Sequence, residues 1–255
     1  MQFGVCAAPE DSQWMKAAGA DFIEGHVQNF LRPAQESWQP SVDLKALPLP
    51  IAAYNCFLPG DLKVVGPAVD LARLKAYAER ACERARAAGS AIIVFGSGGA
   101  RNIPDGWPRD NAQEQLVAAM RIVGPPAAAN SITIVMEPLN RGESNIINSV
   151  TEALTYVKRA ACPGVTVLCD FYHMALENEP LENLDAARGL LDHVHIAEPK
   201  GRIAPGPGMT DYRPFFRKLK GIGYDARISL ECKWEDIRRQ LAPTLEFLRR
   251  EWRAA

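Results

Sequence analysis

A regular alternation of short apolar runs with longer amphipathic stretches narrows the possible folds of this chain more than any other feature. The amphipathic stretches predict helices at Val69–Ala88, Asn111–Val123, Ser149–Ala160, Tyr212–Lys220 and Trp234–Trp252, with weaker patterns at Glu36–Ala46 and after Pro180. The apolar runs predict eight strands: Phe3–Ala7, Asp21–Glu24, Ile51–Cys56, Ala91–Gly96, Ile132–Glu137, Val165–Asp170, His193–Ala197 and Ile228–Glu231. Strand and helix alternating eight times favour a parallel sheet, and eight units suggest a closed (β/α)8 TIM barrel of the α/β class.

The length of the chain agrees with this architecture. Its 255 residues, 47% of them hydrophobic, are close to the roughly 250 residues of one such barrel, so we expect a single domain over residues 1–255. The alternative is an open, doubly wound sheet. No G-x-G-x-x-G follows the first predicted strand, so the dinucleotide-binding version of that alternative has no support.

Composition excludes several classes of partner. The formal net charge is −1, so the chain lacks the excess of positive charge that is typical of nucleic-acid-binding proteins. No run approaches the roughly 18 apolar residues of a membrane span. The six cysteines are scattered without a Cys-x-x-Cys pair, and the N-terminus lacks a basic leader region. We therefore expect a cytoplasmic protein with reduced cysteines that binds neither nucleic acid nor membranes.

The later predicted strands share one pattern, in which an apolar run leads into an ionisable residue at its C-terminal end. The stretch Ser131–Asn140 shows it first, with Glu137 following a run that reads as a strand buried on both faces. Asp170, His195 and Glu231 occupy the same place in the next three strands. Because the C-terminal ends of parallel barrel strands meet on one face, these four side chains should converge.

Convergence of three carboxylates requires a compensating cation. Oxygen-rich ligation with one imidazole suits a divalent ion such as Mn, Mg or Co, and Zn would also fit. Any one of these residues alone is more often a loop cap or a salt-bridge partner than a metal ligand. One such residue at each of four consecutive strand ends is a much more specific signal.

These residues resemble the xylose-isomerase-like TIM-barrel superfamily of sugar isomerases and epimerases, in particular the ketose 3-epimerase group typified by D-tagatose 3-epimerase. The motifs that carry the resemblance are Glu137-Pro-Leu-Asn-Arg-Gly-Glu143, Asp170-Phe-Tyr-His173, His193-Val-His195-Ile-Ala-Glu198 and Ser229-Leu-Glu231, and the likeness extends over the whole chain.

The resemblance implies a role for each residue. One divalent metal ion would be held by Glu137, Asp170, His195 and Glu231. Glu137 and Glu231 would also form the catalytic acid–base pair. His173 and Arg202 would bind substrate oxygens, and Glu143 would contact the substrate or support His173.

The implied activity is that of a metal-dependent sugar epimerase or isomerase. Its substrate would be a ketose or related keto-polyol, its intermediate a cis-enediolate, and its assembly, by analogy, a homodimer or homotetramer. Three features depart from the group's pattern: Gly142 stands where many ketose epimerases carry an aromatic residue, the loop Glu198–Arg202 is slightly longer than usual, and the chain is somewhat short for the group. The glycine-rich stretch Phe95–Arg101 could cradle an anion or could be a flexible loop at the barrel rim.

Other functions remain open. A hydroxypyruvate-isomerase-like or inosose-dehydratase-like enzyme would use the same scaffold. A DNA-repair endonuclease of the type IV kind shares the barrel but needs several zinc ions and many histidines, whereas this chain has four histidines and no basic bias. A non-catalytic sugar-binding barrel would have no need for the opposed pair Glu137 and Glu231.

Overall fold

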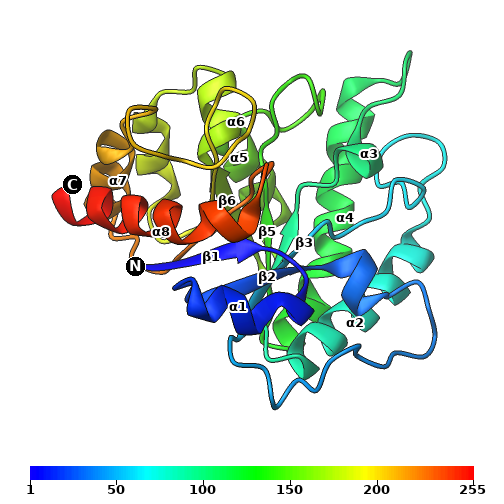
Figure 1. Ribbon diagram of the computed structural model, residues 1–255. Helices are drawn as coiled ribbons and strands as arrows, with labels where there is room; N and C mark the ends of the chain where they lie inside the picture. The colour runs from blue at the N-terminus through cyan, green and yellow to red at the C-terminus, as the bar shows by residue number, and fades with distance from the viewer.

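Eight parallel strands form a closed barrel in the computed structural model, which describes all residues from 1 to 255 (Figure 1). The strands are β1 Gln2–Cys6, β2 Phe22–His26, β3 Ile51–Asn55, β4 Ile92–Phe95, β5 Thr133–Met136, β6 Val165–Asp170, β7 Leu191–Ile196 and β8 Arg227–Leu230. Each pairs with the next, and β8 pairs with β1 to close the barrel. All eight predicted strands and the predicted fold class are confirmed.

The helices lie outside the strands (Figure 1). They are α1 Ser12–Ala17, α2 Leu71–Ala87, α3 Gly98–Arg101, α4 Arg109–Ala129, α5 Val150–Ala160, α6 Phe171–Leu176, α7 Arg213–Gly221 and α8 Ile237–Ala254, with short helical turns η1 Pro9–Asp11, η2 Val27–Leu31 and η3 Leu181–Ala187. The five main predicted helices are present. None of the helices combines the length and the apolar character needed to cross a membrane.

Of the two weaker helix predictions, the one after Pro180 corresponds to η3, and the one at Glu36–Ala46 was wrong. The stretch Glu36–Ala46 contains no helix, because Pro40 lies in its middle and cannot donate the backbone hydrogen bond that a helix interior needs. The helix predicted at Asn111–Val123 is longer than predicted, because α4 continues past Val123 through Pro125 and Pro126. Gly124 precedes that proline and has no Cβ, which relieves the usual clash between a proline ring and the preceding residue.

Side-chain alternation along the strands aims the ionisable residues into the barrel. Five fully or nearly buried apolar residues form a small cluster separate from the large core under the helices: Ala53, Ile92, Val94, Val135 and Leu168. Glu137 and Asp170 follow Val135 and Leu168 by two residues, so they share the inward face one layer nearer the C-terminal rim.

The C-terminal helix lies against the start of the chain. In Figure 1, α8 (red) runs beside the blue N-terminal elements. The Nη2 atom of Arg249 in α8 donates to the Gly19 carbonyl at 2.7 Å and to the Asp21 carboxylate at 2.8 Å. This contact joins the two ends of the barrel around the β8–β1 seam.

Candidate active site

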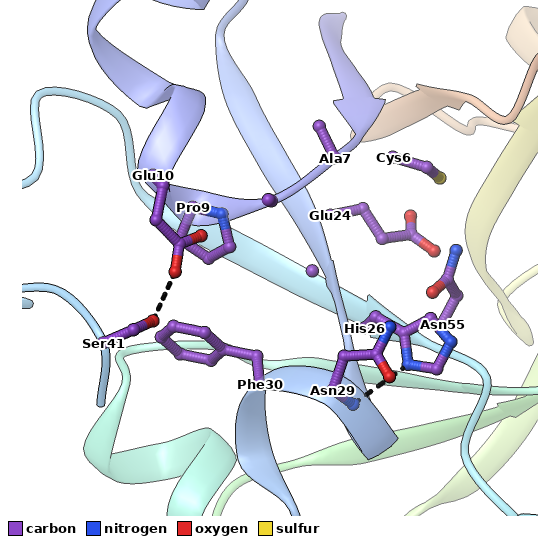
Figure 2. Close-up of a pocket in the computed structure, with 12 residues that line it drawn as sticks. Cys6, Ala7, Pro9, Glu10, Glu24, His26, Asn29, Phe30, Ser41 and Asn55 are labelled. Carbon is purple, nitrogen blue, oxygen red and sulfur yellow. Dashed lines mark hydrogen bonds between the residues drawn. The ribbon is translucent and has the colours of Figure 1, made fainter. Parts of the chain in front are cut away.

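Two cavities open at the C-terminal ends of the strands. The larger, about 460 Å³, lies over β1, β2 and β3 (Figure 2). The smaller, about 200 Å³, is lined by Glu137 and Glu231 together with the predicted substrate-binding residues Glu143 and Arg202. Asn55, the last residue of β3, lines both cavities, so they are neighbours over one barrel.

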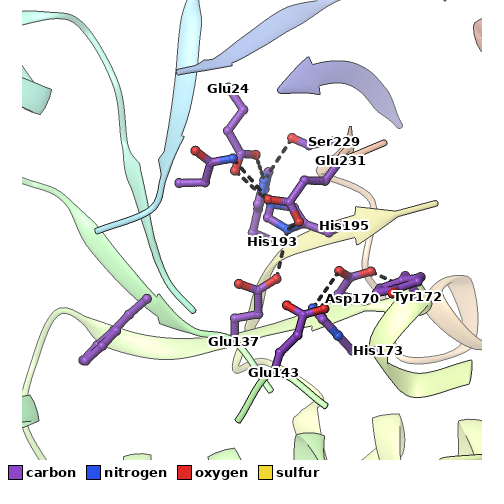
Figure 3. Close-up of polar contacts among 12 residues, drawn as sticks. Glu24, Glu137, Glu143, Asp170, Tyr172, His173, His193, His195, Ser229 and Glu231 are labelled. Carbon is purple, nitrogen blue, oxygen red and sulfur yellow. Dashed lines mark hydrogen bonds and ion pairs between the residues drawn. The ribbon is translucent and has the colours of Figure 1, made fainter. Parts of the chain in front are cut away.

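The four residues predicted as metal ligands lie together. One potential ligand atom from each of Glu137, Asp170, His195 and Glu231 falls within 4.8 Å of all the others. They come from four consecutive strands: Glu137 directly follows β5, Asp170 ends β6, His195 lies in β7 and Glu231 directly follows β8 (Figure 3). We call this group the four-residue cluster.

The cluster is organised around one nitrogen of His195. Its Nδ1 atom lies 3.1 Å from Glu137 Oε1 and 3.3 Å from Glu231 Oε2. The backbone fixes the positions of both glutamates, since the Glu137 amide donates to the Phe95 carbonyl and the Glu231 amide to the Ile196 carbonyl, each at 3.2 Å. Both carboxylates therefore stand on strand ends that are tied to a neighbouring strand.

A glycine leaves room for the Glu137 carboxylate. A Cβ atom placed on Gly96 would lie 2.2 Å from Glu137 Oε2, well inside any allowed contact. Gly96 follows β4, next to β5 in the sheet. A side chain at position 96 would therefore force the Glu137 carboxylate to shift from its place in the cluster.

Glu24 in β2 pairs with two histidines of β7. Its Oε1 atom lies 2.8 Å from His195 Nε2, and its Oε2 atom lies 2.7 Å from His193 Nε2. His193 also contacts Ser229 Oγ at 3.1 Å, so it is a buried, hydrogen-bonded neighbour of the cluster. Because His195 Nε2 donates a hydrogen bond to Glu24, the other ring nitrogen, Nδ1, is the one that faces the carboxylates of the cluster.

The charges in the cluster pull the pKa values of its members apart. Burial raises the pKa of Glu137. Burial also raises the pKa of Asp170, to about 7, and the carboxylates of Glu137 and Glu231 add to this rise. Burial acts the same way on Glu231, but His195 and Arg202 outweigh it and lower its pKa to about 2. The two glutamates thus differ in their affinity for a proton, as an acid and a base must.

The predicted substrate-binding residues border the cluster. Arg202 forms ion pairs with Glu231, with Asp170 Oδ2 at 3.6 Å and with Glu143 Oε1 at 3.5 Å. The pKa of His173 is lowered to about 3 by burial and by the nearby Arg202, so its ring is neutral. Its Nδ1 accepts a hydrogen bond from the Asn140 amide at 3.1 Å, which leaves a proton on Nε2, 3.5 Å from Asp170 Oδ2.

Two buried polar atoms at the cluster lack a hydrogen-bond partner. They are Asp170 Oδ2 and His173 Nε2. A buried carboxylate oxygen without a partner is costly unless a ligand completes its contacts. Three carboxylates, one of them with an unsatisfied oxygen, and one imidazole nitrogen form a donor set that suits a divalent cation, so these residues fit such an ion.

The glycine-rich stretch Phe95–Arg101 leads into the short helix α3. Arg101 is fully buried, its Nη1 donates to the Phe95 carbonyl at 3.1 Å, and burial lowers its pKa to about 10. The guanidinium therefore faces the protein interior, and it does not reach outward to an anion at the rim.

Sequence reasoning missed two residues of the site. Asn140 connects two predicted ones, since its Nδ2 lies 2.9 Å from Glu143 Oε1 and 2.8 Å from His173 Nδ1. Asn55 donates from Nδ2 to Glu231 Oε1 at 3.2 Å. Asn55 is the last residue of β3 and the next to last of the predicted strand Ile51–Cys56, so the rule that found the four-residue cluster could have found it had amides been included.

Comparison with curated proteins finds sugar epimerases. The chain is 31% identical over 143 residues to a 3-dehydro-D-guloside 4-epimerase of Escherichia coli (strain K12), covering 55% of this chain and 54% of that protein. It is 33% identical over 138 residues to a ketose 3-epimerase of Arthrobacter globiformis, covering 53% of this chain and 46% of that protein. The chain thus spans about half the length of the curated relatives it matches.

Solved structures share the whole fold. A 3-keto-D-glucoside 4-epimerase from Escherichia coli superposes with a TM-score of 0.83 at 24% identity, over 98% of this chain and 99% of that one. A D-allulose 3-epimerase from Methylomonas sp., solved with D-allulose, superposes with a TM-score of 0.82 at 23% identity, over 98% and 97%. At these identities the likeness establishes the fold. The family model described as xylose isomerase-like TIM barrel matches residues 12–251, so the chain belongs to that family.

Proposed function

We propose that this protein is a sugar epimerase that depends on a divalent metal and inverts a carbon next to a ketone. The observation that carries the proposal is the placement of Glu137 and Glu231 on either side of His195 Nδ1, at 3.1 and 3.3 Å. Figure 3 shows the two glutamates approaching His195 from two sides. The epimerases among the relatives support the reaction class.

The chemistry requires one group to take a proton and another to return it. A hydrogen on the carbon beside a ketone is weakly acidic, and its removal leaves an enediolate. One of the two carboxylates, Glu137 and Glu231, would take that proton and the other would return one from the opposite face of the substrate. Return of the proton from the opposite side inverts the carbon, and return to the neighbouring carbon interconverts aldose and ketose.

The metal would be held by Glu137, Asp170, His195 and Glu231. When bound, a divalent ion would act as a Lewis acid on the substrate oxygens and stabilise the charge of the enediolate. Mn, Mg or Co suits this donor set, and Zn fits as well.

The remaining polar groups would hold the substrate. His173 presents a protonated Nε2 without a partner, and Arg202 presents its guanidinium beside Glu231. Both can donate hydrogen bonds to the carbonyl and hydroxyl oxygens around the reacting carbon. Glu143 is tied to His173 through Asn140, so it can accept from a substrate hydroxyl and also orient the histidine.

Isotope exchange tests the proposal. The metal-loaded protein is incubated in D₂O with ketoses, keto-glycosides, keto-acids and inososes, and NMR follows deuterium at the carbon beside the carbonyl. We expect exchange and inversion with a sugar ketone. Absence of exchange with every compound would remove the enediolate mechanism, and preference for a keto-acid or an inosose would favour the alternative activities on this scaffold.

A further inference from the structure

The larger cavity, over β1, β2 and β3, is not used by the proposed chemistry. Its inner end is formed by Cys6, Glu24 and Asn55, beside the four-residue cluster, and its outer end by Glu10 and Ser41 (Figure 2). It is more than twice as large as the smaller cavity, at about 460 against 200 Å³. A pocket within the range of ~300–1,000 Å³ holds a drug-sized ligand, which is larger than a single hexose.

Asn55 connects this cavity to the reacting centre. The residue is 8% exposed, and its Nδ2 donates to Glu231 Oε1 at 3.2 Å. No hydrogen bond within the protein uses its Oδ1, and the residue lines both cavities. An amide oxygen without a protein partner at the border of two cavities can accept a hydrogen bond from a hydroxyl of a ligand that spans them.

The lining indicates the chemistry of that ligand. No lysine or arginine lines the larger cavity, whereas two carboxylates do, so a phosphate or carboxylate group would be repelled. His26 Nδ1 accepts from the backbone amides of Gln28 and Asn29, at 3.2 and 3.3 Å, which leaves its Nε2 as a donor. The Ser41 hydroxyl donates to Glu10, and the Phe30 ring supplies an apolar wall for C–H edges. Donors, acceptors and an aromatic face without a cation suit an uncharged group rich in hydroxyls.

We propose that the natural substrate is a keto sugar carrying an uncharged glycosyl or polyol substituent, and that this substituent binds in the cavity over β1, β2 and β3 next to Asn55. The inference rests on the proposed epimerase function and names its substrate class. The reacting ketone lies at the four-residue cluster, and the bond to the substituent stays intact through the reaction.

Kinetics on matched substrates test the inference. The metal-loaded protein is compared on a glucose disaccharide oxidised to a ketone on one ring, the methyl glycoside of the same keto sugar, a free ketohexose and its phosphate ester. We expect kcat/KM for the keto-disaccharide to exceed that for the methyl glycoside by about tenfold or more, as the loss of one or two hydrogen bonds would give. Equal values for the two, or preference for the phosphate ester, would overturn the inference.

A cavity-filling variant localises the effect. Ala8 is an exposed residue that lines the larger cavity, so Ala8→Trp should narrow it without disturbing the core. We expect Ala8→Trp to lower kcat/KM for the keto-disaccharide about tenfold more than that for the methyl glycoside. Ala186→Trp, at an exposed position of η3, is the matched control and should change neither. If Ala8→Trp had no effect on the disaccharide, the substituent would not lie in this cavity.

Binding separates the two proposals. Saturation-transfer NMR with the unoxidised disaccharide requires no turnover. If no substrate reacts but Ala8→Trp abolishes disaccharide binding, the epimerase function fails and the cavity assignment stands. If ketoses react but the wild-type protein shows no disaccharide binding at millimolar concentration, the cavity assignment fails and the epimerase function stands.

Discussion

The first half of the barrel, β1 to β4, and the second half, β5 to β8, carry different kinds of residue at their C-terminal strand ends. Strands β5 to β8 end in charged or imidazole groups: Glu137, Asp170, His195 and Glu231. Strands β1, β3 and β4 lead into small or uncharged residues: Cys6, Asn55 and Gly96. The second half brings its charges within 4.8 Å of one another, and the first half leaves a cavity of about 460 Å³. The fold thus separates the groups that can move protons from the space that can admit substrate.

Glu24 is the exception that relates the two halves. It belongs to β2 in the first half, yet its carboxylate pairs with His193 and His195 in the second. Variants of first-half residues that contact the second half should therefore change the behaviour of the four-residue cluster as well.

The largest effect is expected from Glu231→Gln. Glutamine keeps the shape of the side chain but cannot take a proton, so kcat should fall by about 10²–10⁴-fold while the thermal unfolding curve is retained. Steady-state epimerisation and D₂O exchange measure this loss. Normal turnover by the variant would refute the acid–base role of Glu231.

Gly96→Ala tests whether the missing side chain at position 96, in the first half, leaves the space that the Glu137 carboxylate of the second half occupies. The added methyl group would lie 2.2 Å from Glu137 Oε2, so Glu137 must move, and a displacement of this size costs about 10²-fold in activity. Gly60→Ala is the control, because a Cβ there meets no atom within 4 Å. Activity equal to that of the control would mean that the position of Glu137 is adjustable.

Glu24→Gln should weaken metal binding. Removing the carboxylate that accepts from His195 Nε2 loosens the orientation of a proposed ligand, and such partners are worth about 10–100-fold in metal affinity. Calorimetric titration with Mn²⁺ measures the affinity directly. Glu10→Gln, an exposed glutamate of the larger cavity, is the control, and an equal change in both variants would indicate a general effect of charge.

The smallest effect is expected outside both halves, at Ser149. Its side chain accepts from the Glu152 amide at 3.1 Å and caps the N-terminus of α5. Ser149→Ala should cost about 1 kcal/mol of unfolding free energy in a urea titration and leave kcat unchanged. Ser149→Asp retains a capping oxygen and should restore the stability, which a loss unrelated to capping would not allow.

The strands and the four-residue cluster could be predicted because both depend on local patterns. The end of an apolar run of strand length marks the C-terminal end of the strand. In a parallel barrel these ends lie on the same face, so the residues there come together. The pairing of Glu24 with His193 and His195 joins residues about 170 positions apart, so it depends on the curvature of the closed barrel. The larger cavity was also out of reach, because it arises where small side chains such as Ala7 and Gly25 face the same space.

Arg202 gives the cluster a resident counter-ion. Its guanidinium sits beside Glu231 and Asp170, and it stacks 4.7 Å above the ring of Tyr172. This positive charge offsets part of the repulsion among three carboxylates in the absence of a metal. If the proposed ion binds, the site would then be charged after folding, and the metal content of a preparation should follow the divalent ions in its growth medium.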